Sequence, residues 1–254
     1  MTKLLIGDAG HGCKDPGTSG AGLQEAKLTE EADAYIAARF AALGVPYKRT
    51  RPNKDCLTND QRTSRVKSSG ATLCYSYHFN SGKPSQDRVE VIHSVHAGSD
   101  VRRHAQNLAN AIAKVSGQDT KVYSRKLSST SNNDYYFMHR QTGNVRTLIV
   151  EFQFLDGPGV KKLHDKKYRE AMYEALVKEH CAYIGHKYVA LGAAAKPTSP
   201  APKPAGRTFQ PAGKSHAEAW EWAYKEGLLD GHTPNEPLTR AQFATVMKRI
   251  SDKK

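Results

Sequence analysis

Strand-like and helix-like segments alternate along residues 2–191 of this 254-residue chain, and this alternation constrains the fold more than any other feature. Short apolar runs predict strands, whereas apolar residues recurring every three or four positions predict helices. We predict strands at residues 3–8, 45–50, 72–78, 88–94, 120–123 and 146–151. We predict helices at residues 27–43, 60–68, 101–115 and 168–184. This order predicts an α/β fold, a twisted mixed or parallel sheet flanked by helices.

The composition changes near residue 193. Residues 193–212 are rich in proline, alanine and lysine and have no apolar periodicity, which predicts an extended spacer. Residues 213–254 contain two helix-like stretches joined by Gly227–Gly231, and a module of this size is near the lower limit for independent folding. We therefore expect one large domain at residues 1–192, a linker at 193–212 and a small helical module at 213–254.

The formal net charge of +13 predicts attraction to a polyanion, either nucleic acid or an anionic bacterial wall. The alternative is a solvated basic surface with no specific partner. The basic residues are spread along the chain rather than gathered in an arm, which favours a broad anionic surface over groove recognition. The chain also lacks a recognisable nucleic-acid-binding motif, so we expect no nucleic-acid partner. The sequence leaves the oligomeric state open.

The N-terminal segment predicts no export signal. Its apolar run, Leu4–Ile6, is shorter than the roughly 7–15 residues of a secretory h-region. No stretch approaches the roughly 20 apolar residues of a membrane span, so we expect no membrane insertion. We expect synthesis in the cytoplasm. The four cysteines are irregularly spaced without a Cys-x-x-Cys pair, which predicts free thiols in a reducing compartment: Cys13, Cys56, Cys74 and Cys181.

Two histidines and a glutamate lie at or just beyond the ends of predicted strands. His11 stands in Asp8-Ala9-Gly10-His11-Gly12, His78 stands in Ser76-Tyr77-His78-Phe79-Asn80, and Glu151 closes a later strand. Functional groups collect at the carboxyl ends of strands in such sheets. Two imidazoles and one carboxylate form a three-ligand zinc site that keeps a position open for water, as catalytic zinc sites do. Glu25 and Glu151 supply one carboxylate to bind metal and one to move protons, which predicts a zinc hydrolase.

These blocks resemble amidase family 3, the zinc-dependent N-acetylmuramoyl-L-alanine amidases. Members typically carry Asp-x-Gly-His-Gly-Gly, then Gly-Leu-x-Glu, then Ser-x-His-x-Asn, then Val-Glu-x-x-Phe-Leu. In this chain the four blocks begin, in the same order, at Asp8, Gly22, Ser76 and Val150. The resemblance covers about the first 190 residues. The chain departs from the pattern at Cys13, Gln153 and Gly157, none of which replaces a ligand.

The resemblance implies a reaction and a role for each site residue. His11, Glu25 and His78 would hold Zn²⁺, and Glu151 would be the catalytic carboxylate. The implied activity is hydrolysis of the amide bond between N-acetylmuramic acid and L-alanine in peptidoglycan. A non-catalytic wall-binding protein is disfavoured because all four positions are intact.

The C-terminal module resembles, more weakly, a single S-layer homology repeat, chiefly in Leu238-Thr239-Arg240-Ala241-Gln242. Such repeats bind wall polysaccharides, so anionic or secondary wall polymers are expected partners. The alternative is a helical pair that only folds or self-associates. A catalytic domain, linker and tail without an export signal suggest a phage endolysin that reaches the wall after holin-mediated release. A host autolysin or sporulation-associated lysin is the alternative.

Three further residues are candidates for substrate or supporting contacts: Asn80, Tyr136 and Arg140. Asn80 could instead hold the His78 loop, Tyr136 could pack in the core, and Arg140 could be solvated. Among other carboxylates, we expect Glu30 and Glu31 to be solvated helix charges. We expect five other histidines to be surface or packing residues: His93, His96, His104, His139 and His164.

Glu90 is the remaining alternative carboxylate. It falls between Val89 and Val91 in a predicted strand, so its side chain should point away from the face that these valines share. We keep it as a possible neighbour of the active site.

Overall fold

The computed structural model describes residues 4–52, 55–83, 85–191 and 222. The chain divides into two units, residues 1–191 and residues 192–254. The expected linker at 193–212 and the expected module at 213–254 lie outside the described residues, apart from Trp222, and stay predictions. Within the described part of the chain, no helix is both long and apolar enough to cross a membrane.

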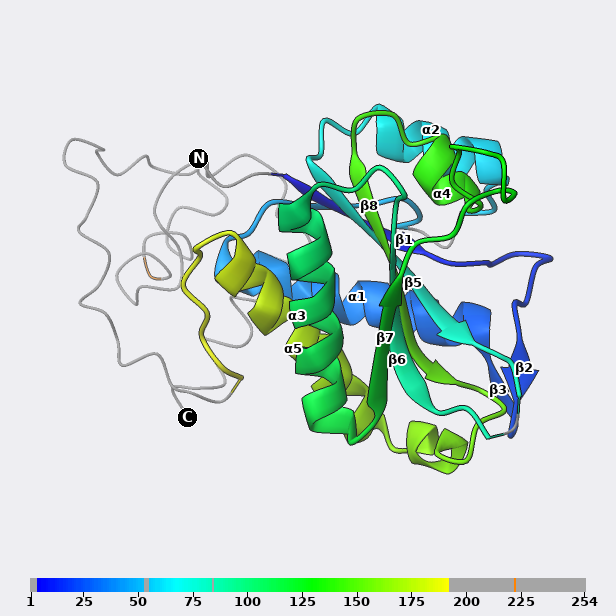
Figure 1. Cartoon of the computed structure of the whole chain (residues 1–254). Coiled ribbons are helices and arrows are strands. Elements are labelled where there is room, and N and C mark those ends of the chain that lie inside the picture. The colour runs from blue at the N-terminus through cyan, green and yellow to red at the C-terminus, as the bar shows by residue number, and fades with distance from the viewer. Residues whose placement is uncertain (1–3, 53–54, 84, 192–221, 223–254) are drawn as a thin grey trace. The chain divides into compact units, whose positions relative to one another are not determined.

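A six-stranded mixed sheet forms the centre of the first unit (Figure 1). Its strands are β1 (Leu5–Ala9), β4 (Tyr47–Arg49), β5 (Leu73–Asn80), β6 (Arg88–His93), β7 (Asp119–Tyr123) and β8 (Arg146–Phe154). The spatial order is β4-β1-β5-β8-β6-β7. Strands β4, β1, β5 and β8 are parallel, whereas β6 is antiparallel to β8 and parallel to β7. The predicted fold class is confirmed.

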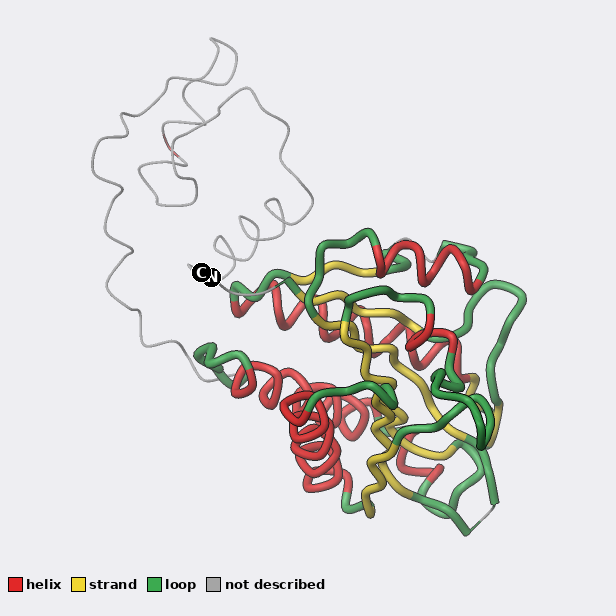
Figure 2. Tube along the Cα trace, turned by 45° about the horizontal axis from the view of Figure 1, so that its top comes forward, coloured by secondary structure: helices red, strands yellow, loops and turns green. Residues whose placement is uncertain are grey.

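Helices cover both faces of the sheet, and Figure 2 shows the strands as a layer among them. Helices α1 (Glu25–Leu43), α3 (Ser99–Ser116) and α5 (Lys166–Tyr183) pack on the face that carries Tyr75, Tyr77 and Phe152. Helices α2 (Asn59–Lys67) and α4 (Phe137–Arg140) contribute Val66 and Met138 to a smaller apolar cluster on the other face. The large cluster is the main source of stability because burial of apolar area dominates folding.

Several elements differ from the sequence prediction. Strand β8 continues to Phe154 because Phe152 and Phe154 remain buried, so Glu151 lies inside the strand rather than at its end. Helix α1 begins at Glu25, two residues early. Four elements were missed because they are too short to show a period: strands β2 (Ser19–Gly20) and β3 (Leu23–Gln24), helix α4, and the 3₁₀ helix η1 (Val160–His164).

The prediction of four free cysteines was wrong for two of them. Cys13 and Cys56 form a disulfide, whereas Cys74 and Cys181 are free and buried. Cys13 lies in the loop after β1 and Cys56 in the loop after β4. Since β1 and β4 are adjacent and parallel, both loops leave the same edge of the sheet. Irregular spacing in sequence therefore concealed a proximity that strand pairing creates.

Candidate metal centre and active site

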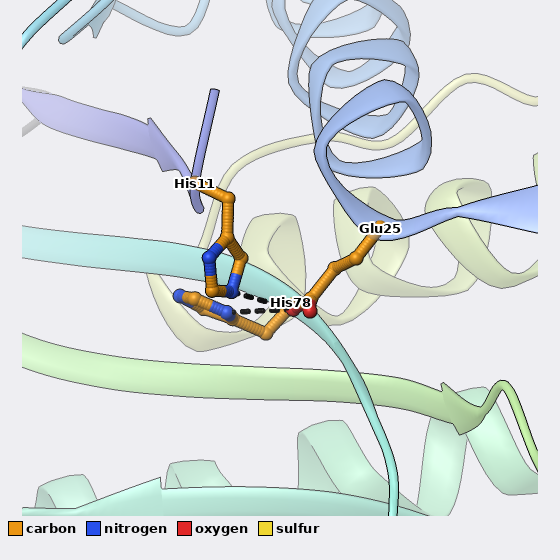
Figure 3. Close-up of side chains that lie close together, drawn as sticks. All are labelled: His11, Glu25 and His78. Carbon is orange, nitrogen blue, oxygen red and sulfur yellow. Dashed lines mark hydrogen bonds and ion pairs between the residues drawn. The ribbon is translucent and has the colours of Figure 1, made fainter. Parts of the chain in front are cut away.

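Three predicted ligands come together at one edge of the sheet (Figure 3). His11 follows β1, Glu25 is the first residue of α1, and His78 lies in β5. One ligand atom from each lies within 4.8 Å of the others. Glu25 Oε1 is 3.1 Å from His11 Nε2 and 2.9 Å from His78 Nδ1. Two ring nitrogens thus face one carboxylate.

Parallel pairing of β1 and β5 brings the two histidines side by side. Ala9 pairs with Tyr77, and the Gly10 N–H donates to the Tyr77 carbonyl at 3.0 Å. A Cβ on Gly10 would lie 2.3 Å from the His78 ring, so this position requires glycine. The two imidazoles meet edge to face with centroids 4.9 Å apart.

Backbone donors fix the carboxylate of Glu25. Its Oε1 accepts from the Phe79 N–H at 3.1 Å, and its Oε2 accepts from the Thr18 N–H at 2.8 Å. The start of a helix also favours a negative side chain through the helix dipole. Burial alone would raise the pKa of Glu25, but hydrogen bonds from His11 and His78 outweigh burial and hold that pKa well below its usual range.

The two histidines differ electrostatically. Burial alone would lower the pKa of His11, but Glu25 and Asp15 outweigh it and raise that pKa. Burial lowers the pKa of His78 despite Glu25.

Asp15 orients His11, and sequence reasoning passed it over. Its Oδ2 lies 2.8 Å from His11 Nδ1, which leaves His11 Nε2 directed at Glu25. Histidines that bind metals commonly hold a carboxylate through the other ring nitrogen. A carboxylate four residues after a predicted ligand was the available signal. The donor set, its close spacing and this supporting carboxylate all fit a divalent metal such as zinc.

Asp8, the first residue of the His11 block, has a structural position. It is fully buried and accepts hydrogen bonds from Arg62 Nε at 3.0 Å, Thr50 at 2.9 Å and Ser76 at 2.8 Å. Burial alone would raise the pKa of Asp8, but the Arg62 charge and these hydrogen bonds outweigh burial and lower it. Asp8 therefore joins β1 to β5, to α2 and to the residue that follows β4.

Glu151 lies beside the metal ligands in the sheet. It pairs in register with His78 of β5 and with Glu90 of β6. Residues paired across neighbouring strands present their side chains on the same face. Among the described residues, Glu151 Oε2 is buried without a hydrogen-bond partner. Burial, followed by the negative charges of Glu25 and Glu90, raises the pKa of Glu151 well above its usual range. Such an environment increases the affinity of a carboxylate for a proton.

Glu90 lies beside Glu151 in the candidate active site, a position that the sequence allowed. The flanking valines Val89 and Val91 belong to the large core, so Glu90 faces the opposite side. Its Oε1 accepts from Arg88 Nε at 2.6 Å, and its Oε2 accepts from Asn80 Nδ2 at 3.2 Å and from the Tyr123 hydroxyl at 3.1 Å. The carboxylate of Glu90 is thus held on both oxygens directly beside Glu151.

The three candidate substrate residues have specific contacts. Asn80 binds Glu90 through its amide and accepts from the Ser81 N–H at 2.8 Å. The Tyr136 hydroxyl lies 3.4 Å from that of Tyr123, which connects it to the Glu90 network. Arg140 donates to the carbonyls of Asp134 and Tyr135, so it stabilises the loop that precedes α4.

The predictions for Glu31 and His104 had different outcomes. Glu31 was expected to be solvated, but it binds Arg169 at 2.7 and 2.8 Å. His104 is a buried packing residue, as expected.

Comparison with known sequences defines the family. Residues 6–179 match the family described as N-acetylmuramoyl-L-alanine amidase. This match spans more than half of the chain, so the protein belongs to that family. Family and fold together support peptidoglycan amidase activity. A curated relative, the uncharacterized protein YqiI of Bacillus subtilis (strain 168), is 26% identical over 177 residues, which cover 69% of this chain and 82% of YqiI.

Solved structures share the fold. Cwp6 from Clostridium difficile gives a TM-score of 0.67 at 21% identity and covers 72% of this chain. This chain covers only 30% of Cwp6. The catalytic domain of CwlV, an N-acetylmuramoyl-L-alanine amidase from Bacillus (Paenibacillus) polymyxa var. colistinus, gives a TM-score of 0.61 at 19% identity. That alignment covers 73% of this chain and 99% of the CwlV domain.

Proposed function

We propose that this protein is a zinc-dependent amidase that hydrolyses the bond between N-acetylmuramic acid and L-alanine in peptidoglycan. The observation that carries the proposal is the cluster of His11, Glu25 and His78, whose ligand atoms lie within 4.8 Å of one another. Glu151 pairs in register with His78 on the neighbouring strand. Three protein ligands leave a fourth position for water or substrate, which distinguishes catalytic from structural zinc sites.

Some residues of the site would bind the metal, and Glu151 would transfer protons. His11, Glu25 and His78 would hold the metal, with Asp15 fixing the His11 ring. Zinc bound there would supply Lewis acidity to the scissile carbonyl and to water. Glu151 takes a proton from the attacking water and returns it to the departing amine nitrogen, as amide hydrolysis requires. Among the described residues, Glu151 Oε2 has no hydrogen-bond partner, so this oxygen is free to take that proton.

A digest of purified peptidoglycan tests the proposal directly. Mass spectrometry should find stem peptides with a free L-alanine amino terminus and glycan strands with free lactyl groups. Chelation should abolish these products, and added zinc should restore them. Cuts within the stem peptide or glycan, or full activity without metal, would contradict the proposal. Glu151→Gln is the matched control because it keeps the shape of the side chain but removes the proton acceptor.

We also propose that the biological setting is host lysis by a phage endolysin rather than wall turnover by a host enzyme. The support is the sequence layout of an amidase domain, a proline-rich segment and a basic chain expected to adhere to anionic wall polymers. Expression in a bacterium with a susceptible wall should cause lysis only when a holin is co-expressed. Lysis without a holin would favour an enzyme that reaches the wall by its own export route.

A further inference from the structure

The turn that carries His11 has an unusual backbone. His11 and Cys13 both have φ of 59°, and Gly12 between them has φ of 112°. Residues with side chains rarely adopt the left-handed region, and they do so where surrounding contacts impose it. The contacts that impose this conformation therefore also set the position of the His11 ring.

The tip of the turn is closed on itself. The Gly12 N–H donates to the Asp15 carbonyl at 2.8 Å, and the Asp15 N–H donates back to the Gly12 carbonyl at 3.1 Å. These backbone groups therefore do not join the turn to the sheet. The turn is joined to the neighbouring loop by the Cys13–Cys56 disulfide and by Arg51.

Arg51 lies directly against the turn. Its guanidinium donates to the Ala9 carbonyl at 3.1 and 3.3 Å, and a Cβ on Gly12 would come within 2.2 Å of its Nη1. Arg51 thus holds the start of the turn at Ala9, and the disulfide at Cys13 links the middle of the turn to Cys56.

The other half of the disulfide is firmly anchored. Asp55, the neighbour of Cys56, forms an ion pair of 2.5 Å with Arg65 of α2. Two residues after Cys56, Thr58 begins α2 with a capping box that involves Gln61. The disulfide therefore attaches the His11 turn to the fixed end of a helix, not to a free loop.

Both linked cysteines are exposed, whereas Cys74 and Cys181 are buried. A small thiol can reach the disulfide without unfolding of the protein. Reduction would leave the sheet and α2 in place and would remove the covalent link between the His11 turn and the loop before α2.

We propose that the Cys13–Cys56 disulfide is a positioning element for His11, and that zinc affinity consequently depends on the redox state of this pair. The inference rests on the proposed zinc function. Oxidation transfers two electrons and two protons from the two thiols to a low-molecular-weight disulfide, which becomes two thiols. The reverse reaction uses two thiols of a reductant and yields its disulfide. The oxidised protein holds His11 Nε2 facing Glu25, whereas the reduced protein allows the turn to move.

Zinc affinity is the discriminating measurement, because a disulfide also stabilises a fold by restricting the unfolded chain. Loss of supporting contacts around a ligand typically weakens metal binding by about 10–100-fold. We expect the Cys13→Ser/Cys56→Ser variant of the full chain to have a zinc Kd about 10-fold higher than the oxidised wild type. A chromophoric chelator in competition would report the Kd.

Two controls separate positioning from general destabilisation. Cys74→Ala/Cys181→Ala removes two thiols but keeps the disulfide, so its zinc Kd should match that of wild type. A phosphine reductant should weaken zinc binding in wild type and leave the Cys13→Ser/Cys56→Ser variant unchanged. Hydrogen exchange of zinc-free protein should show faster exchange at residues 12–15 in this variant and unchanged exchange in β5.

The outcomes distinguish this inference from the function on which it rests. Equal zinc Kd values for the oxidised and disulfide-free proteins would overturn the positioning role while leaving the zinc assignment intact. Four free thiols in protein prepared under oxidising conditions would also overturn it. Failure of every form to bind zinc would overturn the proposed metal function itself, and this inference with it.

Discussion

Two buried histidines should make the fold sensitive to mild acid. Tyr75 of β5 lies between His104 of α3 and His180 of α5, with its hydroxyl 2.5 Å from His104 Nε2 and 2.8 Å from His180 Nδ1. His104 is 1% exposed and His180 is 2% exposed. Burial lowers the pKa of His104 to about 4, with a smaller contribution from Arg146. Burial lowers the pKa of His180 to about 3, with smaller contributions from His104 and His186.

The direction of the effect follows from proton binding. Well above pH 6.5 both histidines are neutral in the folded and the unfolded chain, so they add no pH dependence. Below pH 6.5 the unfolded chain takes up protons that the folded chain refuses, and the free energy of unfolding falls. The loss grows until the pH reaches the folded pKa values of about 4 and about 3.

The size of the stability loss depends on how far the pH lies below the unfolded pKa of about 6.5. Each histidine lowers the free energy of unfolding by about 1.4 kcal/mol for each pH unit below that pKa. At pH 5 this amounts to about 2 kcal/mol for each, or about 4 kcal/mol for both. Small domains are stable by only about 5–15 kcal/mol, so the loss would be a large share of the total.

Chemical denaturation at pH 7 and pH 5 checks this reasoning. His104→Gln/His180→Gln should be less stable than wild type at pH 7 but should lose about 4 kcal/mol less between the two pH values. His164→Gln is the control because His164 is exposed. Saturating zinc in all samples makes protonation of the metal ligands common to every variant. An equal loss in wild type and the double variant would refute the argument.

Three further predictions concern the site. Glu151→Gln should bind zinc like wild type but lose about 10²–10⁴ in kcat, as measured by metal analysis and muropeptide release, and an unchanged kcat would exclude Glu151 as the base. His78→Ala should lose zinc as well as activity, and retention of one equivalent of zinc would remove His78 from the ligand set. Arg62→Met should lower the free energy of unfolding by about 3–5 kcal/mol because it leaves the Asp8 carboxylate buried without its partner charge, and a loss below about 1 kcal/mol in denaturant titrations would contradict that role.

Much of the fold could be predicted from the sequence because apolar residues recur at the spacing typical of a helix or a strand in most of its elements. Apolar runs marked the strands, and the strand-helix alternation predicted the layers. The ends were less accurate: β8 extends past Glu151 because Phe152 and Phe154 are also buried. Short elements such as β2, β3 and α4 have too few residues for any period to appear.

The candidate ligands could be predicted because each stands in a recognisable block, whereas the sequence marks their supporting residues at most by spacing, as with Asp15 four residues after His11. Asp15 and Thr18 act on His11 and Glu25 through loop geometry, for which single-sequence patterns offer no period. The Cys13–Cys56 bond depends on the pairing of β1 with β4, a tertiary fact that cysteine spacing does not encode.

The position of Glu90 depends on two features of the sheet. The alternation of side chains along a strand sets which face Glu90 occupies, and the register between strands sets which residue lies beside it. Alternation placed Glu90 opposite its flanking valines, but it did not say which residue of which strand would lie beside it. In the structure β6 runs antiparallel to β8, and Glu90 pairs with Glu151. Arg88 Nε donates to Glu90 Oε1 at 2.6 Å, and this ion pair lowers the cost of placing the Glu90 carboxylate beside Glu151. A shift of one residue in that register would turn Glu90 into the valine core and leave Asn80 and Tyr123 without their shared acceptor, because alternate residues face opposite sides of the sheet.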